Sequence, residues 1–394
     1  MRQVALFIES SRSYGRGLLK GIAAYVGAHG HWSIRHQEMS INAPPPKWLG
    51  QWKGDGILAR IESNKLAETI RALGIPAVDL RCSKRIEGVP QINADDQAVI
   101  QMAVDHLRER GLKRFAFCGF ATADYSIRRL ELFQDYVNEC GFETQVYESR
   151  GPRNPTTMGA EQTGMLDQDG VTAWLESLEK PIGLLAVNDI RGQQVLQCCE
   201  DAGIGVPDDV AVIGIDNDDV ICPLCRPNLT SVELDTPRIG HEAAALLDRM
   251  MDGDEPPADT VLVPPSRVII RGSSDVVAID DRVVATAYRF LREHACRGIS
   301  VTEVVDQVPL SRRSLERRIR EHFGRSPAEL IAQTRLARVK QLLEATELPL
   351  KQIARLTGFV HDEHMAVFFR KHVGRPPGQY RTDWQAAHLK ILSD

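Results

Sequence analysis

Residues 301–324 read VTEVVDQVPLSRRSLERRIREHFG, and residues 350–374 read LKQIARLTGFVHDEHMAVFFRKHVG. In each stretch a short helix with apolar periodicity meets a turn and is followed by a second amphipathic helix, which is the pattern of a helix-turn-helix unit. Ser311 is a good N-cap for the second helix of the first unit, and Gly358 supplies a left-handed turn in the second unit. Two such units can place helices in successive major grooves of DNA, about 34 Å apart.

Residues 285–385 as a whole resemble the DNA-binding domain of the AraC/XylS family of transcription regulators. The match keeps both units in register, whereas a single helix-turn-helix stretch would fit an unrelated helical bundle equally well. The resemblance implies that DNA is a partner, bound at tandem half-sites. The matching positions are Ser311, Leu315, Phe323, Gly324, Ser326, Pro327, Arg335, Leu342, Ile353, Ala354, Gly358, Phe359, Phe369, Gly374, Pro377 and Tyr380.

The second helix of the first unit has one apolar face and one basic face. Leu315, Ile319 and Phe323 form the apolar stripe, which leaves the arginines facing outward. The resemblance places three positions of this helix against base edges, where arginine can pair with two acceptors of guanine. The alternative for each arginine is a phosphate contact or a solvated face. The DNA-binding residues expected here are Arg312, Arg313, Glu316, Arg317 and Arg320, of which Arg313, Glu316 and Arg317 are the base-reading ones.

The second unit departs from the family pattern. Val367 stands where an arginine is common in the family, and residues 362–363 are both acidic. This helix therefore either reads apolar thymine methyl groups or binds weakly and positions the domain. Lys371, Arg375 and Arg381 are expected to contact phosphates. The DNA-binding residues expected from this unit are Glu363, Val367, Lys371 and Arg381.

The charge of the chain is distributed unevenly. Residues 281–394 carry 20 Lys and Arg against 13 Asp and Glu, a balance of +7. Residues 1–280 carry 28 basic and 40 acidic side chains, so that the whole chain has a formal net charge of −5. A basic C-terminal part on an acidic body fits contact with nucleic acid through the C-terminal part alone.

Buried strands alternate with amphipathic helices through the first 275 residues. The strands have continuous apolar runs, which is typical of a parallel sheet covered on both faces. The pattern restarts near residue 112, and this indicates two similar lobes with a cleft between them. We therefore expect an α/β two-lobed sensor at 1–275, a linker at 276–284 and an all-α domain with two helix-turn-helix units at 285–390.

The first part resembles the LacI/periplasmic sugar-binding fold over nearly its full length. The run VPDDVAVIGIDN at residues 206–217 carries the most specific part of this resemblance. Most LacI-type sensors follow a DNA-binding domain, whereas here the sensor precedes an AraC-type domain. This order resembles that of the xylose operon regulator type. The resemblance implies a homodimer that responds to a sugar effector, D-xylose, and that activates pentose catabolic genes together with RNA polymerase.

Polar side chains follow several strands of the expected sheets. In open α/β sheets, ligands bind beyond the carboxyl ends of the strands. Carboxylates accept hydrogen bonds from sugar hydroxyls, arginine and asparagine donate to them, and an aromatic ring can stack on the sugar. Asp189 and Asp216 have an alternative role as helix N-caps, which are common at such junctions. The sugar-binding residues expected from position and resemblance are Tyr14, Arg129, Asn188, Asp189, Arg191 and Asp216.

Other functions remain as alternatives at this stage. A sugar-modifying or nucleotide-dependent enzyme on the α/β body is the alternative from another class. Residues 15–21 hold three glycines behind a strand, so a dinucleotide site has to be considered. The third glycine is one position late for a dinucleotide fingerprint, and no acidic residue closes a second strand at the usual distance. Response to another sugar and repression also stay open. We expect no cofactor, no metal site, no membrane span and a cytoplasmic location with reduced thiols.

Overall fold

The computed structural model describes residues 1–394 except 31, 39–43, 150–156, 276–280 and 392–394. The chain forms two compact units, Met1–Ala278 and Ile279–Asp394. Of the linker expected at 276–284, residues 276–280 lie outside the described residues. The second unit begins its first helix, α10, at Arg282, inside that expected range.

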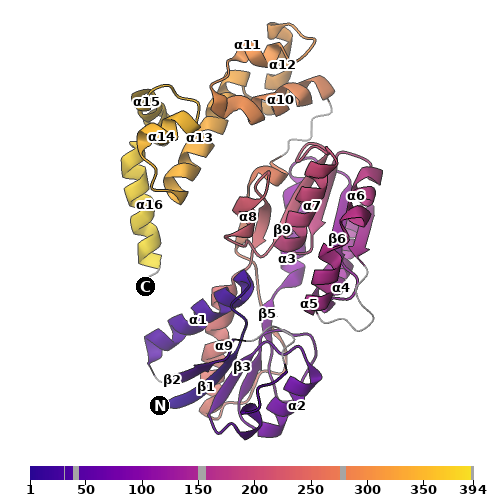
Figure 1. Ribbon diagram of the computed structural model, residues 1–394, viewed down its shortest axis with the longest axis vertical. Coiled ribbons are helices and arrows are strands. Elements are labelled where there is room, and N and C mark those ends of the chain that lie inside the picture. The colour runs from indigo at the N-terminus through magenta and orange to yellow at the C-terminus, as the bar shows by residue number, and fades with distance from the viewer. Residues whose placement is uncertain (31, 39–43, 150–156, 276–280, 392–394) are drawn as a thin grey trace. The chain divides into compact units, whose positions relative to one another are not determined.

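The first unit contains a parallel sheet of four strands and a mostly parallel sheet of six strands, both with helices against their faces (Figure 1), and a separate two-stranded pair. The smaller sheet has the strand order β2-β1-β3-β4, and all its neighbouring strands are parallel. It forms the N-lobe together with three helices. The elements of the N-lobe are β1 (Arg2–Phe7), α1 (Ser13–His29), β2 (Trp32–His36), η1 (Leu49–Gln51), β3 (Gly56–Ala59), α2 (Asn64–Leu73), β4 (Ala77–Asp79) and α9 (Thr236–Met251).

The larger sheet has the order β12-β10-β9-β8-β6-β7 and is parallel except for the pairing of β12 with β10. It forms the C-lobe. The elements of the C-lobe are α3 (Asp96–Arg108), β6 (Phe115–Phe120), α4 (Asp124–Glu139), β7 (Thr144–Ser149), α5 (Thr157–Met165), α6 (Gln168–Ser177), β8 (Ile182–Ala186), α7 (Asp189–Asp201), β9 (Val210–Ile215), α8 (Ile221–Leu224), β10 (Thr230–Glu233), β12 (Arg267–Ile269) and η2 (Gly272–Ser274).

The described chain passes between the two lobes three times. Two of the passages are made by β5 (Ile92–Ala94) and β11 (Val261–Val263), which pair in parallel, and the third joins β10 to α9. The continuous apolar runs that the sequence predicts as strands form β1, β3, β4, β6, β8 and β9, whereas β2, β5, β7, β10, β11 and β12 were not expected. Most of these unexpected strands lie at sheet edges or in the connections, where strand patterns are short and mixed with polar residues.

Helices α1 and α9 pack closely against each other in the N-lobe. A Cβ atom added at Gly17 would lie 1.8 Å from the Thr236 Oγ1, and one at Gly21 would lie 1.8 Å from the Pro237 carbonyl oxygen. The glycines of residues 15–21 therefore let two helix backbones approach, and the dinucleotide interpretation of this motif has no support from its surroundings.

The second unit consists of two helix-turn-helix halves that share a long central helix. The same positions recur 50 residues apart, because Leu315 and Met365 fill corresponding places in the two apolar cores and Gly324 and Gly374 end the second helix of each half. The elements are α10 (Arg282–His294), η3 (Ala295–Arg297), α11 (Val301–Val305), α12 (Arg312–Phe323), α13 (Pro327–Ala345), α14 (Leu350–Leu356), α15 (Asp362–Val373) and α16 (Pro377–Ile391).

Two residues expected to shape the helix-turn-helix halves do so. The Ser311 hydroxyl caps α12 by accepting a hydrogen bond from the backbone N–H of Ser314. Gly358 has a φ of +79° after α14, and a Cβ there would lie 2.7 Å from the backbone nitrogen of Gly298 in the first half. Gly358 is thus required both by its left-handed conformation and by the close approach of the two halves.

Replacing Gly21 by Ala should lower the free energy of unfolding of the first unit by about 1–3 kcal/mol, because the new methyl group would overlap the Pro237 carbonyl. Gly27 lies in the same helix with open space around it, so Gly27→Ala is the matched control and should stabilise the unit by about 0.5–1 kcal/mol. Denaturant titrations of the two variants compare them directly. Equal stability of the two would contradict the close packing of α1 against α9.

Candidate functional site

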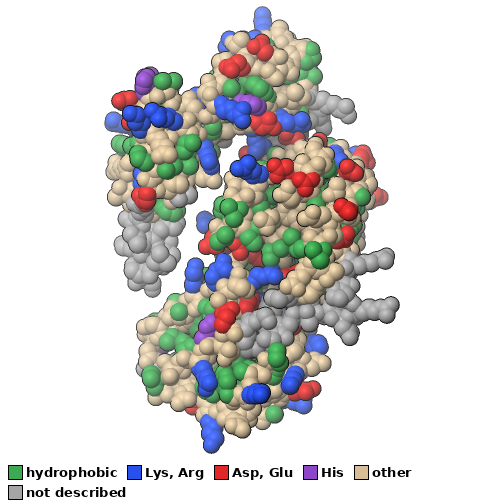
Figure 2. Space-filling view, in the orientation of Figure 1, with side chains coloured by type: hydrophobic (Ala, Val, Ile, Leu, Met, Phe, Trp, Pro, Cys, Tyr) green, Lys and Arg blue, Asp and Glu red, His purple; other side chains and the backbone are tan. Residues whose placement is uncertain are grey.

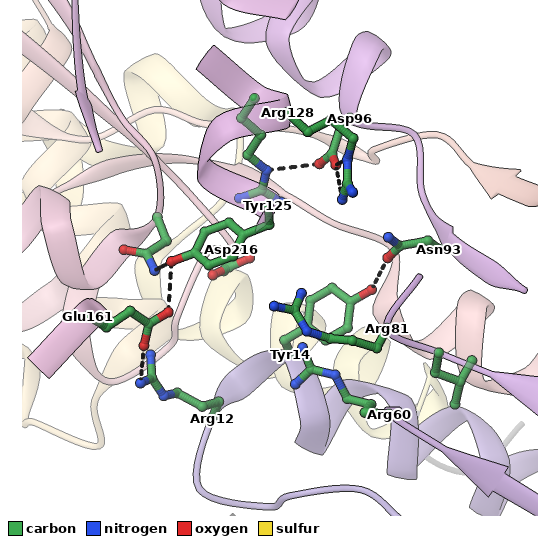
Figure 3. Close-up of a pocket in the computed structure, with 13 residues that line it drawn as sticks. Arg12, Tyr14, Arg60, Arg81, Asn93, Asp96, Tyr125, Arg128, Glu161 and Asp216 are labelled. Carbon is green, nitrogen blue, oxygen red and sulfur yellow. Dashed lines mark hydrogen bonds and ion pairs between the residues drawn. The ribbon is translucent and has the colours of Figure 1, made fainter. Parts of the chain in front are cut away.

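A polar pocket lies between the two lobes of the first unit (Figure 3). Its residues surround about 620 Å³ of non-protein space, a figure that includes open solvent at the mouth. The lining comes from the carboxyl ends of strands and the first turns of helices in both lobes. The lining residues are Arg12, Tyr14, Arg60, Leu80, Arg81, Asn93, Asp96, Tyr125, Arg128, Arg129, Glu161, Asn188 and Asp216.

Four of the six residues expected to bind sugar line this pocket: Tyr14, Arg129, Asn188 and Asp216. The Tyr14 hydroxyl donates to the Asn93 Oδ1 at 2.8 Å, and burial raises the pKa of this hydroxyl above its ordinary value. The guanidinium of Arg60 lies 4.8 Å from the centre of the Tyr14 ring. The Tyr14 hydroxyl therefore stays protonated, and its ring is held in place at the N-lobe wall of the pocket.

Arg129 is held by an ion pair and a backbone contact. Its Nε donates to the Asp96 Oδ1 at 2.8 Å and its Nη1 donates to the Val187 carbonyl at 2.8 Å. Arg128 pairs with the other Asp96 oxygen, also at 2.8 Å. Burial by itself would raise the pKa of Asp96, but the two guanidiniums outweigh that effect and hold the pKa below the ordinary value. The Asp96 carboxylate is thus ionised and orients both arginines.

Asn188 is the N-cap of α7, because its side-chain oxygen accepts from the Arg191 backbone N–H at 2.9 Å. Its amide group donates to the Tyr125 hydroxyl at 2.9 Å. The same residue, two positions after the end of β8, therefore starts a helix and places an amide at the pocket.

Asp216 has an unusual backbone conformation and an available carboxylate. Its φ is +109°, a region that non-glycine residues seldom adopt, and its backbone N–H donates to the Val232 carbonyl at 3.1 Å. Within the described part of the chain, no protein group hydrogen-bonds to its carboxylate. Burial is the main cause that raises the pKa of Asp216, with the nearby Glu161 adding to it. Strained backbone of this kind is common at binding sites.

Asp189 does not reach the pocket. It is buried, and its carboxylate accepts hydrogen bonds from the Ser231 hydroxyl at 2.6 Å, the Asp218 backbone N–H at 2.7 Å and the Cys222 thiol at 3.2 Å. Burial and then the negative charge of Asp216 raise the pKa of Asp189. It is the first residue of α7 and not its N-cap. Its position supports a role in fixing the loop that carries Asp216, in place of the direct sugar contact expected from sequence.

Arg191 also lies away from the pocket. It is fully buried, and its guanidinium donates to the Gly119 carbonyl, the Gly164 carbonyl, the Ser149 hydroxyl and the Gln194 side chain. It packs on the face of the Phe120 ring, with its guanidinium carbon 4.4 Å from the ring centre. Arg191 thus ties α7 to the ends of β6 and β7, which differs from the expected sugar contact.

Several residues that line the pocket were not expected from the sequence. Arg60 follows β3 directly and Arg81 lies two residues after the end of β4, so the rule that found Asn188 could have found them too. Their guanidiniums pair with Glu9 and Glu62, which also follow strands or lie next to them. Glu161 carries no such signal, because it lies within α5, a helix without a clear apolar face. The other lining residues that were missed are Arg12, Leu80, Asn93, Asp96, Tyr125 and Arg128.

The candidate DNA interface is the outer face of α12. Arg313 and Arg320 are exposed and have no hydrogen-bond or ion-pair partner among the described residues. Arg312 pairs with Glu316 at 2.9 Å, and Arg317 pairs with Glu321 at 3.2 Å, both one helical turn apart. A shallow surface depression on this helix is lined by Arg313, Ser314, Glu316, Arg317, Arg320 and Glu321. In the space-filling view, basic side chains gather on the second unit (Figure 2).

The outer face of α15 is less basic. Val367 is 71% exposed, and Glu363 is exposed in the first turn, where an acidic side chain suits the helix dipole. Lys371 is exposed in the last turn. The side chains expected to reach DNA from this helix are therefore all accessible.

Arg381 differs from its expected role as a phosphate contact. Its guanidinium donates to the Leu348 carbonyl at 2.7 Å and to the Leu343 carbonyl at 3.4 Å. Arg335 makes the same kind of contact in the first half, to the carbonyls of Ala295 and Ile299. Arg381 therefore joins the end of α13 to α16, and its guanidinium hydrogen-bonds to backbone carbonyls of the protein itself.

The described residues contain no group of His, Cys, Asp and Glu arranged to hold a metal ion. The eight cysteines are free, and the pair Cys222 and Cys225 is buried. A search of the described helices finds none that combines the length and the apolar character needed to cross a membrane.

Both units match known protein families. A model described as a periplasmic binding protein-like domain matches residues 104–274, and a model described as a helix-turn-helix domain matches residues 304–383. A LacI family transcriptional regulator from Enterococcus faecium, solved with bound ribose, superposes with a TM-score of 0.56 at 20% identity. That similarity covers 70% of this chain and shows the fold of the first unit.

The full chain also has relatives of the same length. The xylose operon regulatory protein of Escherichia coli K12 is 31% identical over 387 residues, which cover 96% of each protein. The protein of the same name from Haemophilus influenzae is 30% identical over 96% of this chain and 98% of its own. A solved structure described as the xylose-binding transcription activator XylR has a TM-score of 0.78 and 30% identity, and covers 97% of this chain and 98% of its own.

These similarities and the geometry of both units define a class: the protein is a sugar-responsive, DNA-binding transcription regulator and not an enzyme. It joins a periplasmic-binding-protein-like sensor to an AraC-type helix-turn-helix domain. Within that class, the chain belongs to the family of the xylose operon regulatory proteins.

The contacts of Arg381 lead to a testable contrast with Lys371. Arg381→Gln should lower the melting temperature of the second unit, because two helix-end carbonyls lose a charged donor. Lys371→Gln is the matched control: it should leave the melting temperature unchanged and lower the salt slope of DNA binding by about one unit. Thermal melts and salt titrations of operator binding measure both. If Arg381→Gln left the melting temperature unchanged and reduced the salt slope of DNA binding, Arg381 would contact a DNA phosphate, as expected from the sequence.

Proposed function

We propose that D-xylose binds in the interlobe pocket and that its binding controls how the helix-turn-helix unit engages DNA. The available carboxylate of Asp216 is the observation that carries the proposal. A pentose presents neighbouring hydroxyl groups, and a carboxylate that no protein group engages can accept from two of them. Tyr14 and Tyr125 offer ring faces for the C–H face of the sugar. The name of the Escherichia coli relative supports xylose as the sugar.

The balance of charges in the pocket supports an uncharged ligand. Five arginines line it, and they are matched by five carboxylates, of which three line the pocket and two lie behind it. No positive charge is left over for a phosphate or an acid group, so a neutral sugar fits better than a sugar phosphate. The carboxylates are Glu9, Glu62, Asp96, Glu161 and Asp216.

In this proposal the sugar stabilises the closed arrangement of the two lobes. A ligand can shift an equilibrium only by the difference in its affinity for the two states, and a sugar that touches both lobes has that difference. Closure then alters how the second unit binds tandem half-sites upstream of sugar-catabolic genes. We further propose that the protein acts in the cytoplasm as a homodimer and activates transcription with RNA polymerase.

A panel of monosaccharides tests the identity of the sugar. Binding at one site should add about 2.7 kcal/mol of stability when the free sugar is at 100 times its dissociation constant. D-Xylose should raise the melting temperature of the full-length protein more than arabinose, ribose or glucose at equal concentration. A larger shift with another sugar would mean that this sugar, and not xylose, is the effector. The interlobe pocket would remain the proposed binding site. Transcription in vitro with purified RNA polymerase then distinguishes activation from repression.

Replacing Asp216 by Asn should weaken xylose binding at least about tenfold, because a hydroxyl loses a charged acceptor. Operator affinity without sugar should stay unchanged. The surface variant Asp201→Asn, on α7 of the same lobe, is the control and should bind sugar as the wild type does. Calorimetric titration with xylose measures all three proteins, and unchanged affinity in Asp216→Asn would remove this residue from the site.

The pH dependence of binding follows from the raised pKa of Asp216. A carboxylate accepts from sugar hydroxyls in its ionised form, so xylose affinity should be full at high pH and fall as the pH drops through the raised pKa. The fall should therefore begin at a higher pH than it would for an ordinary aspartate, whose pKa is 3.8. The Asp216→Asn variant should lose this pH dependence.

The two recognition helices should contribute unequally to specificity. Replacing Arg313 or Arg317 by Ala should weaken binding to the operator by about 1–3 kcal/mol and relax the preference at one base pair, because each can read a guanine edge. Val367→Ala should have a smaller effect, confined to a thymine-containing step. Binding to a randomised operator library gives the preferences, and equal information in both halves of each site would contradict this division.

A further inference from the structure

A chain of hydrogen bonds in the pocket converges on the carboxylate of Glu161 (Figure 3). The Asn188 amide donates to the Tyr125 hydroxyl at 2.9 Å, and that hydroxyl donates to the Glu161 Oε1 at 2.7 Å. Burial and the nearby negative charge of Glu161 raise the pKa of Tyr125 well above its ordinary value, so the hydroxyl stays a donor. All three residues belong to the C-lobe, and together they fix the Glu161 carboxylate.

The other oxygen of Glu161 faces the N-lobe. Its Oε2 accepts from the guanidinium of Arg12, the residue that precedes α1 and follows β1. The Glu161 side chain is 8% exposed and that of Arg12 is 28% exposed. This ion pair therefore joins the two lobes and is only partly screened by solvent.

A second set of charges joins the lobes at the neighbouring loop. Arg16, in the first turn of α1, lies 3.6 Å from Asp219 and 3.9 Å from Asp218, which follow β9 in the C-lobe. The N-lobe thus presents two arginines from the start of one helix, and the C-lobe presents carboxylates to both. Opposite charges on facing lobes attract whenever the lobes approach.

We propose that Glu161 is a positioning residue whose ion pair with Arg12 acts as a latch that draws the two lobes together before the sugar binds. Because the pair forms only when the lobes meet, it stabilises the closed state. The apparent affinity of a ligand that needs the closed state rises with the fraction of closed molecules. The latch therefore sets both the closure of the sugar-free protein and the affinity for the sugar, and this second effect rests on the proposed function of the pocket.

The latch has a signature that a purely structural glutamate would lack. Xylose carries no charge, so salt has little direct effect on its contacts. Salt does weaken ion pairs that form on closure, and the Debye length falls from roughly 14 Å to 4 Å between about 50 mM and 500 mM salt. Sugar affinity in the wild-type protein should therefore decrease with salt. A variant without the latch should show a weaker salt dependence, because only the pairs of Arg16 with Asp218 and Asp219 remain.

The first measurement needs no ligand. Spin labels on non-canonical residues at Lys65 in α2 and Glu131 in α4, both exposed, report the distance between the lobes of the full-length protein. Without sugar and at low salt, the wild type should populate a short distance that lengthens in high salt. At low salt, Glu161→Gln should show a longer distance than the wild type, and this distance should change less with salt because only the pairs of Arg16 remain. The same distances in Glu161→Gln and wild type would overturn the latch, whatever sugar the protein binds.

The control variant makes the same Glu→Gln change at an ion pair that does not join the two lobes. Glu179→Gln removes an exposed ion pair with Arg114 that lies within the C-lobe, so it should leave the interlobe distance and its salt dependence unchanged. A similar lengthening in Glu179→Gln would mean that any lost ion pair opens the lobes, and would overturn the specific role of Glu161.

The second measurement is a double-mutant cycle on xylose affinity. Arg12→Gln and Glu161→Gln should each weaken binding by about five- to tenfold, and the double variant should be no weaker than either single one, because both changes break the same pair. Additive losses would show that the two side chains contact the sugar independently and would overturn the latch. If the distances behave as expected and xylose does not bind, the latch stands and the proposed effector fails.

Discussion

The compensation of charge in the interlobe pocket is the constraint on which the sensor depends. A charge that leaves water needs a partner of opposite sign, because its desolvation otherwise costs several kcal/mol. Asp96 shows how this is met, since one carboxylate orients Arg128 and Arg129 while the Val187 carbonyl accepts from the latter. These pairings fix the C-lobe wall of the pocket before a ligand enters. They also leave Asp216 as the carboxylate free to receive it.

The loop that carries Asp216 is fixed from behind by a second buried carboxylate. Asp189 accepts from the Asp218 backbone and from Ser231, and the Ser231 hydroxyl in turn accepts from the Asn217 backbone at 3.0 Å. This support keeps Asp216 at a positive φ that an aspartate seldom adopts. The loop also carries the carboxylates that meet Arg16 of the other lobe. The loop that contacts the ligand through Asp216 and the other lobe through Asp218 and Asp219 is therefore held by the same hydrogen bonds to Asp189.

The DNA-binding unit uses its arginines in two ways that sequence spacing does not distinguish. Arg313 lies on the outer face of α12 with no partner in the described structure, and is free to meet DNA. Arg335 donates instead to the Ala295 carbonyl after α10, and Arg381 donates to the Leu348 carbonyl in the loop between α13 and α14. A basic side chain on an amphipathic helix thus contributes either to binding or to the fold, and the position of the neighbouring helix decides which.

The sequence by itself determined the features that depend on local pattern. The alternation of strands and helices, the two helix-turn-helix halves, the cap at Ser311 and the glycine at 358 follow from periodicity and backbone preference, and so does the approach of Asn188 and Asp216 to a common edge of the sheet. Only the tertiary structure decided which neighbours face the pocket. Asn188, Asp189 and Arg191 lie within one turn, where each residue points about 100° from the last, so packing against β6, β7 and β9 sends two of them inward. Glu161 reaches the pocket from a helix with no distinctive pattern, because its partners, Arg12 and Tyr125, come from distant parts of the chain that only folding brings together.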